Sequence, residues 1–207
     1  MTPEQGRAAR GSADGMDVCV FCGSREGRAA VYREAARSVG RTLGARGHGL
    51  VYGGAGRGLM GVVADAALDA GARVGGVLPE QLFQREVAHP GLDELVVVRS
   101  MHERKAEMAS RSQAFLVLPG GLGTLEETFE IVTWAQLGIH GKPVGLLDVA
   151  GYFRPLLAFL DHAVEEGFLD PDHRRLLLVA EEVDELLDAF ARWEGPVTER
   201  WMGPDET

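Results

Sequence analysis

Seven short apolar runs alternate along the chain with longer segments of helical periodicity. The runs are rich in strand-forming residues and occupy residues 17–21, 49–52, 73–78, 94–98, 114–118, 143–147 and 176–179. The helical segments span residues 29–46, 58–71, 101–112, 124–138, 151–167 and 181–193. Continuously apolar strands that alternate with helices are typical of a parallel sheet covered on both faces. The pattern predicts an α/β fold, a Rossmann-like doubly wound parallel sheet of about seven strands.

The two ends of the chain lack this periodicity. Residues 1–16 are rich in Gly, Ala and Arg, and residues 195–207 in Gly, Pro and charged residues, so we expect a disordered leader and a flexible tail. Residues 17–194 are predicted to form a single domain with a full core. No signal-peptide pattern opens the chain, and no run of about 18 apolar residues occurs. We therefore expect a cytoplasmic protein with no membrane partner.

The charge of the chain argues against nucleic acid as a partner. The formal net charge is −10, and such a chain repels a polyphosphate backbone. A small phosphorylated ligand remains compatible with this charge, because backbone amides and one or two arginines can hold it locally. Lysine is scarce, since Lys105 and Lys142 are the only two.

The two cysteines, Cys19 and Cys22, have the C-x-x-C spacing of redox and zinc motifs. A zinc site needs four ligands, and neither a second cysteine pair nor an H-x-x-x-H pattern completes one. In an apolar strand the two side chains would also point to opposite faces. We interpret them as packing residues and expect neither a metal nor a cofactor.

Glycine-rich or polar stretches follow each of the first five predicted strands. In a parallel α/β sheet, ligands bind beyond the carboxyl ends of the strands, near the point where the strand order reverses. The stretches are GS at 23–24, GGAGRG at 53–58, PE at 79–80, RSMHERKA at 99–106 and PGGLGT at 119–124. Because these ends meet at one edge of the sheet, the sequence predicts a ligand site there.

The stretch GRGLMG, residues 56–61, matches the G-x-G-x-x-G dinucleotide fingerprint, and Glu80 follows near the end of the next strand. The pattern alone is weak in a chain with 28 glycines. It also follows the second strand, and a nicotinamide enzyme usually needs more chain for a substrate domain. We therefore do not favour an NAD site here. We interpret the stretch as a glycine turn that either faces a nucleotide or allows close packing of the backbone.

The stretch PGGLGTLEE, residues 119–127, is the most informative. Pro119 ends a strand, and the glycines after it let main-chain N–H groups approach an anion. Thr124 fits a helix N-cap, and Glu127 would then complete a capping box. Two interpretations of the Glu127 carboxylate stay open: it caps the helix, or it takes part in chemistry.

The stretch RSMHERKAEM also opens on a capping box, from Ser100 to Glu103. Arg104 and Lys105 follow in the first turns of the predicted helix, where the helix dipole disfavours cations. Either an anion or a carboxylate lies near them, or they belong to a solvated helix face.

Together, five stretches resemble the LONELY GUY family, the cytokinin riboside 5'-monophosphate phosphoribohydrolases. They are CVFCGS, VYGGAGRGLMG, SMHERKAEM, PGGLGTLEE and TWAQLGIHGKPVGLL, and the likeness spans about residues 17–194. The family signature P-G-G-x-G-T-x-x-E is fully matched. Bacterial relatives have often been labelled lysine decarboxylases, but that chemistry needs a Schiff-base lysine for pyridoxal phosphate. Neither lysine of this chain stands in a recognisable context for it.

The resemblance implies a homodimer that hydrolyses the N-glycosidic bond of a nucleoside 5'-monophosphate, either N6-prenylated AMP or plain AMP. The products are the free base and ribose 5-phosphate. Arg104 and Glu127 match the catalytic pair of the family, and Glu80, Lys105, Thr133 and the loop 120–126 match its nucleotide contacts. With the neighbouring strand ends added, the predicted substrate-binding residues are Gly23, Ser24, Gly53, Gly54, Glu80, Met101, Lys105, Gly120, Gly121, Leu122, Gly123, Thr124, Leu125, Glu126 and Thr133.

Within this resemblance, Glu127 stabilises positive charge that develops on the ribose, and it activates the attacking water instead or in addition. Arg104 is not expected to donate a proton, because guanidinium stays protonated; its expected role is electrostatic and positional, with Lys105 supporting the phosphate. The proton donor to the base is unassigned. A second hypothesis is a non-catalytic carrier of a nucleotide or of the molybdenum cofactor, and the presence of both Arg104 and Glu127 favours the enzyme.

Overall fold

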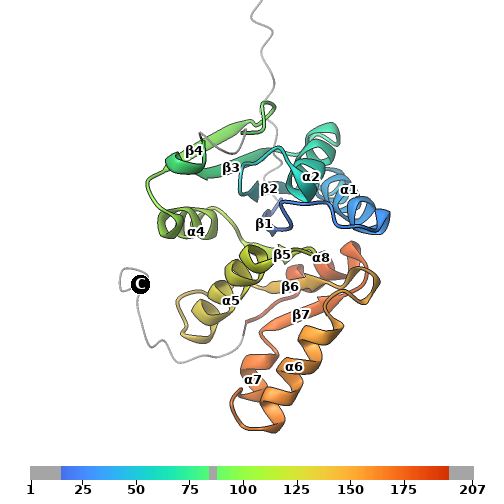
Figure 1. Cartoon of the computed structure of the whole chain (residues 1–207), viewed down its shortest axis with the longest axis vertical. Helices are drawn as coiled ribbons and strands as arrows, with labels where there is room; N and C mark the ends of the chain where they lie inside the picture. The colour runs from blue at the N-terminus through green and yellow to red at the C-terminus, as the bar shows by residue number, and fades with distance from the viewer. Residues whose placement is uncertain (1–14, 84–87, 196–207) are drawn as a thin grey trace, which may run out of the picture.

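The computed structural model describes residues 15–83 and 88–195, so most of the expected leader and tail lie outside the described residues. One parallel sheet runs through the molecule in the order β4-β3-β2-β1-β5-β6-β7 (Figure 1). Its strands are β1 (Asp17–Phe21), β2 (Gly49–Tyr52), β3 (Val74–Pro79), β4 (Glu94–Val98), β5 (Ala114–Val117), β6 (Val144–Leu147) and β7 (Leu177–Ala180). The predicted Rossmann-like α/β class is confirmed, and each predicted strand is present.

Every helix predicted from the sequence is also present. These helices are α1 (Ala30–Ala45), α2 (Gly58–Asp69), α4 (Met101–Ser110), α5 (Leu122–Gln136), α6 (Arg154–Glu165) and α8 (Val183–Ala191). Among the described residues, the structure adds three short helical segments that the periodicity did not predict: α3 (Glu80–Phe83), η1 (Val149–Gly151) and α7 (Pro171–Arg174). Segments of three or four residues are too short to show a helical period.

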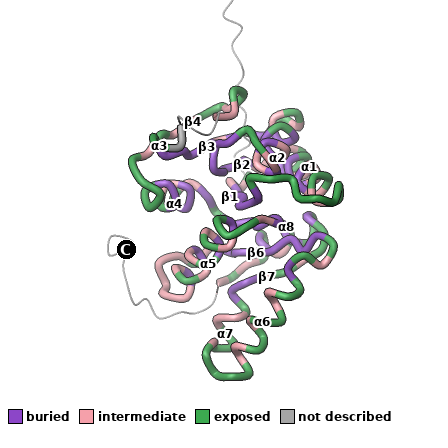
Figure 2. Tube along the Cα trace, viewed as in Figure 1, coloured by how far each residue is buried: buried purple, intermediate pink, exposed green. Residues whose placement is uncertain are grey.

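Along the inner strands of the sheet, side chains alternate between two cores, one on each face. In β1, for example, Val18 and Val20 belong to one core and Cys19 and Phe21 to the other. Helices α1, α2 and α8 cover the first core, and α4, α5 and α6 cover the second. Figure 2 shows the buried residues concentrated in the strands and the exposed ones on the outer helices. Cys19 and Cys22 lie in different cores with free thiols, as the alternation predicted.

The helix expected over residues 151–167 is interrupted at its start. Ala150 and Gly151 have left-handed backbones, with φ of 53° and 72°, and α6 begins only at Arg154. Asp148 stabilises this turn, because its Oδ1 accepts a hydrogen bond from the backbone N–H of Phe153 at 2.7 Å. The result is a fixed corner after β6 that the apolar pattern alone does not reveal.

The strand order reverses at β1, which pairs with β2 on one side and with β5 on the other. The loops that follow β1 and β5 are therefore neighbours, and the N–H of Gly23 donates to the carbonyl of Pro119 at 3.0 Å. The fold thus brings two of the glycine-containing stretches together at one edge of the sheet. Within the described residues, no helix is long and apolar enough to cross a membrane.

Candidate active site

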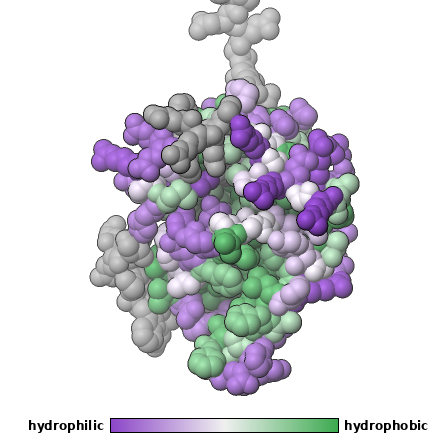
Figure 3. All heavy atoms as spheres, viewed as in Figure 1, coloured by the Kyte–Doolittle hydropathy of each residue, from purple (hydrophilic) through white to green (hydrophobic). Residues whose placement is uncertain are grey.

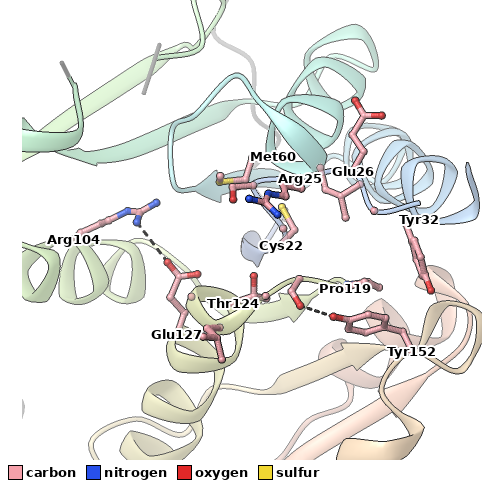
Figure 4. Close-up of a pocket in the computed structure, with 18 residues that line it drawn as sticks. Cys22, Arg25, Glu26, Tyr32, Met60, Arg104, Pro119, Thr124, Glu127 and Tyr152 are labelled. Carbon is pink, nitrogen blue, oxygen red and sulfur yellow. Dashed lines mark hydrogen bonds and ion pairs between the residues drawn. The ribbon is translucent and has the colours of Figure 1, made fainter. Parts of the chain in front are cut away.

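A cavity of about 720 Å³ opens where the strand order reverses, between the loops after β1 and β5 (Figure 4). Its walls also include the start of α2, one residue of α4, the first turns of α5 and the corner after β6. The lining residues are Cys22, Gly23, Ser24, Arg25, Glu26, Gly27, Tyr32, Leu59, Met60, Arg104, Pro119, Gly120, Gly121, Leu122, Gly123, Thr124, Glu127 and Tyr152. Ligands of parallel α/β sheets bind at this position.

One wall is the PGGLGT loop and the start of α5. The helix begins at Leu122 with Gly121 as its N-cap, so the interpretation of Thr124 as the N-cap is wrong. A glycine N-cap lets the helix start earlier than the first capping side chain would indicate, and Thr124 is buried inside the first turn. The amides at this start have no partner within the helix, and such groups attract an anion.

The GRGLMG motif packs against the loop after β1. Gly58 has a left-handed backbone with φ of 60°, and a Cβ at this position would overlap the backbone of Ser24. The N–H of Leu59 also donates to the carbonyl of Gly23 at 3.0 Å. This geometry supports close packing of two loops, and it places Leu59 and Met60 in the cavity wall.

The catalytic candidate Arg104 reaches the cavity from α4. Ser100 is the N-cap of this helix as predicted, and its Oγ accepts a hydrogen bond from the N–H of Glu103 at 3.1 Å. Arg104 is buried, with Nε donating to the carbonyl of Val77 at 3.1 Å and Nη2 to that of Gly53 at 3.2 Å. The ends of β2 and β3 therefore fix the guanidinium.

The remaining guanidinium nitrogen of Arg104 faces Glu127 across the cavity. Nη1 lies 3.6 Å from Glu127 Oε1, and both side chains are at least 87% buried, with exposed fractions of 8% and 13% (Figure 4). The Glu127 carboxylate is therefore aimed at Arg104, and the capping-box interpretation is wrong. The sequence-based hypothesis that a carboxylate lies near Arg104 is confirmed.

The environment of Glu127 makes it a candidate base. Burial raises the pKa of its carboxyl group from 4.5 to about 7, even though the neighbouring Arg104 acts to lower it. A carboxyl group with a pKa near 7 exists in both protonation states at neutral pH, which suits general-base catalysis.

Lys105, the residue after Arg104, points elsewhere. Its Nζ lies 2.5 Å from Glu126 Oε1 and 2.7 Å from Glu130 Oε2, and none of these three residues lines the cavity. Burial acts to lower the pKa of Lys105, but the two carboxylates outweigh it and the net shift is upward. The carboxylates on α5 thus neutralise this cation.

The predicted site residues fall into three groups: those that line the cavity, those that contact Arg104 from outside the lining, and those that do neither. Arg104, Glu127, Gly23, Ser24 and residues 120–124 line the cavity. Gly53 lies behind the guanidinium of Arg104, and the Sδ of Met101 is 4.0 Å from Arg104 Nη1. The remaining predicted residues do not line the cavity; they are Gly54, Glu80, Lys105, Leu125, Glu126 and Thr133.

Several lining residues were not predicted. Arg25 and Glu26 directly follow Ser24, so the loop after the first strand could have been extended to include them. Tyr152 follows β6, and the rule about strand ends applies to that strand as well. Met60 belongs to the GRGLMG motif and could have been included with it, whereas Tyr32 lies within α1 and carries no sequence signal. The described residues contain no group of three or more His, Cys, Asp or Glu placed to hold a metal ion.

Comparison with known proteins assigns this architecture to a family. The chain is 54% identical over 176 residues to a probable cytokinin riboside 5'-monophosphate phosphoribohydrolase of Oryza sativa subsp. japonica, covering 85% of this chain and 83% of that protein. It is 49% identical over 183 residues to a cytokinin riboside 5'-monophosphate phosphoribohydrolase of Arabidopsis thaliana, covering 88% and 85%. The chain belongs to the LONELY GUY family. The sequence-based resemblance is thereby confirmed.

The LONELY GUY chain also matches, over residues 60–190, a family described as "Possible lysine decarboxylase". Neither lysine lines the cavity: Lys105 is held by Glu126 and Glu130, and Lys142 Nζ donates to the carbonyl of Ala109 at 2.7 Å. The arrangement therefore gives no support to Schiff-base chemistry in this cavity.

Solved structures of low sequence identity share the fold. The molybdenum cofactor carrier protein of Chlamydomonas reinhardtii matches with a TM-score of 0.65 at 21% identity, covering 86% of this chain and 98% of that chain. The molybdenum cofactor binding protein of Rippkaea orientalis matches with a TM-score of 0.65 at 20% identity, covering 87% and 98%. At this identity the likeness concerns the fold, since function depends on the site.

Proposed function

We propose that this protein hydrolyses the N-glycosidic bond of cytokinin riboside 5'-monophosphates and releases the free base and ribose 5-phosphate. The observation that carries this proposal is the buried pair Arg104–Glu127 beside the glycine loop, in a chain about half identical to enzymes named for this reaction. Plain AMP has the same phosphate, ribose and glycosidic bond, so it is a second substrate to test. The carrier hypothesis rests on fold likeness alone.

The phosphate would bind at the start of α5. The free amides there supply hydrogen-bond donors, and hydrogen bonds to a charged group contribute about 1.5–3 kcal/mol each. The opposite wall of the cavity supplies Arg25, whose guanidinium makes no ion pair with the described residues. Two walls of the cavity thus offer positive electrostatic potential in a chain of net charge −10.

The sugar would lie beside Glu127. When the bond between the ribose C1' and the base nitrogen breaks, its electron pair leaves with the base and positive charge develops on the ribose. The buried carboxylate stabilises that charge, and it accepts a proton from the water whose oxygen bonds to C1'. Because Arg104 stays protonated, it orients the carboxylate and balances its charge. The departing base takes up one proton from solvent, and the Glu127 carboxyl group releases to solvent the proton that it accepted from water, so the carboxylate is restored.

We also propose that the protein acts as a homodimer in the cytoplasm. Three residues match nucleotide contacts of the family but do not line the cavity of one subunit: Lys105, Glu126 and Thr133. A second subunit that binds the outer face of α5 would explain this mismatch. Figure 3 shows hydrophobic side chains gathered over the lower half of the molecule, the region where α5 and α6 lie. Exposed large hydrophobic residues of α5, of α6 and of the segment after α6 include Leu122, Phe129, Phe159 and Phe168. The free thiols of both cysteines fit a reducing compartment.

The homodimer is tested by sedimentation equilibrium of the full chain. We expect the mass of two chains for the wild type and of one chain for Phe129→Glu, which places a charge on the apolar face. A wild-type protein that sediments as one chain at micromolar concentration would contradict the dimer.

The substrate class is tested by comparing the riboside with its 5'-monophosphate. If the loop amides and Arg25 bind the phosphate, kcat/KM for isopentenyladenosine 5'-monophosphate exceeds that for isopentenyladenosine by at least about 100-fold, because several charge-assisted hydrogen bonds are lost with the phosphate. Equal kcat/KM for the two compounds would contradict a phosphate site in this cavity.

A further inference from the structure

Tyr152 holds the glycine loop from outside the catalytic pair. Its hydroxyl donates a hydrogen bond of 2.5 Å to the carbonyl of Gly120 (Figure 4). The residue lies 32 positions further along the chain, after β6, so this contact joins two strand ends. Gly120 is followed directly by Gly121, the N-cap of α5.

The corner that carries Tyr152 is fixed by its own contacts. Ala150 has a left-handed backbone, which L side chains rarely adopt. The carboxylate of Asp148, itself 4% exposed, accepts a hydrogen bond from the N–H of Phe153 at 2.7 Å. The Tyr152 ring also packs edge-to-face against Phe153, with centroids 5.0 Å apart. The hydroxyl is therefore presented from a defined position.

Tyr152 also contacts the opposite loop through Tyr32. The two rings meet edge-to-face with centroids 5.7 Å apart and an angle of 77°, and a Cβ at Gly27 would overlap the Tyr32 ring at 2.8 Å. Gly27 belongs to the loop after β1, whereas Gly120 belongs to the loop after β5. The tyrosine pair thus spans both glycine-containing walls of the cavity.

The direction of one carbonyl determines the direction of the next amide. In a trans peptide the C=O and the N–H point to opposite sides of the chain. When the Gly120 carbonyl turns toward Tyr152, the N–H of Gly121 turns away from it. Consecutive glycines restrict their own backbone little, so an external contact has to select this orientation.

We propose that Tyr152 is a positioning residue for anion binding, because its hydroxyl fixes the peptide between Gly120 and Gly121 with the amide available to a phosphate. This inference rests on the proposed function for the identity of the anion, the 5'-phosphate of the substrate. Tyr152 does not act on the glycosidic bond. Tyr152 contributes equally to the binding of the substrate and to the binding of the transition state.

The test is Tyr152→Phe, which keeps the ring and removes the hydroxyl. We expect KM for isopentenyladenosine 5'-monophosphate and the Kd for ribose 5-phosphate, measured by calorimetry, both to rise about 3- to 10-fold, since one hydrogen bond is lost. We expect kcat to stay within about twofold of the wild-type value, because the lost hydrogen bond stabilises the bound substrate and the transition state equally. The affinity for free adenine should not change. The matched control is Tyr52→Phe, which removes the hydroxyl of a buried tyrosine that does not line the cavity.

The proposal would be overturned by an unchanged Kd for ribose 5-phosphate in Tyr152→Phe, or by a fall in kcat with KM unchanged. If the role of Tyr152 is only structural, Tyr152→Phe would lower the melting temperature and weaken the binding of adenine and of ribose 5-phosphate alike. This outcome also contradicts the proposal. The binding arm is independent of catalysis. If the wild type binds ribose 5-phosphate more tightly than Tyr152→Phe does but hydrolyses no nucleotide, the proposed function fails and the positioning role stands.

Discussion

Glu127 Oε1 lies 3.6 Å from Arg104 Nη1, and neither side chain exceeds 13% exposure. The two other donors of Arg104 bind backbone carbonyls at 3.1 and 3.2 Å, so the guanidinium is held independently of Glu127. The Glu127 carboxylate, in contrast, sits in a buried environment that raises its pKa to about 7. The pair therefore combines a fixed cation with a carboxylate that can gain or lose a proton near neutral pH.

The first prediction concerns the pH dependence of catalysis. The carboxylate must be ionised to stabilise the ribose cation or to accept a proton, and its pKa is raised from 4.5 to about 7 by burial. We therefore expect kcat at saturating nucleotide to be constant above about pH 8 and to fall about tenfold per unit well below pH 7. A kcat that stays constant down to pH 5 would contradict the assignment of Glu127. Glu127→Gln should lose about 100-fold or more in kcat and show no such acidic limb.

The second prediction concerns stability and needs no substrate. The folded-state pKa of Glu127 lies above its ordinary value of 4.5, so the folded protein binds this proton more tightly than the unfolded chain. The contribution of this group to the free energy of unfolding is complete below pH 4.5 and is lost as pH rises through 7. A rise from 4.5 to about 7 corresponds to at most about 3 kcal/mol.

Glu127→Gln removes this loss, because glutamine carries no charge to bury. We expect urea denaturation at pH 8 to give a higher free energy of unfolding for Glu127→Gln than for the wild type, by about 1–3 kcal/mol. Near pH 5 the two should differ by much less. A variant that is less stable than the wild type at pH 8 would show that the ion pair with Arg104 outweighs burial.

The third prediction tests the position of Arg104 without replacing it. A Cβ at Gly53 would overlap Arg104 Nη2, whereas at Gly75, on the neighbouring strand, the nearest atom would lie 4.0 Å away. We expect Gly53→Ala to lower kcat about 10- to 100-fold by displacing the guanidinium. Gly75→Ala is the matched control and should retain activity. Wild-type kcat in Gly53→Ala would contradict a role for the Arg104 position.

The fourth prediction concerns Arg25, which lines the cavity from the loop after β1. Arg25→Gln should raise KM for the nucleotide about 10-fold, because a charge-assisted hydrogen bond is worth about 1.5–3 kcal/mol. The rise should shrink at high salt. Arg28→Gln removes an equal charge from an exposed residue of the same loop that does not line the cavity. Equal KM changes in the two variants would assign the effect to general charge.

Much of the fold could be predicted because its determinants are local. Apolar runs such as 114–118 are continuous, and strand and helix periods differ clearly, so each long element was predicted within a few residues. The corner at 148–153 was missed because the left-handed turn at Ala150 and the Asp148 carboxylate that stabilises it leave no periodic signal. The start of α5 was misplaced because a glycine at the N-cap carries no capping side chain.

The catalytic candidates could be named from the sequence, but not their relationship. Arg104 and Glu127 lie 23 positions apart on different helices, and only the reversal of strand order at β1 brings them together. Tyr152 could not be linked to Gly120 from periodicity, because the contact depends on how two separate loops pack. The pKa of Glu127 is likewise a property of burial in the assembled site.

We propose that this site cleaves the N-glycosidic bond through Arg104 and Glu127. The most direct measurement is the amount of free base and ribose 5-phosphate released from isopentenyladenosine 5'-monophosphate and from AMP by the full chain, with Glu127→Gln and Arg104→Ala beside it. We expect the two products in equal amounts from the wild type, and a loss of about 100-fold or more in each variant. Binding of the nucleotides without release of either product, or release that persists in both variants, would contradict the account.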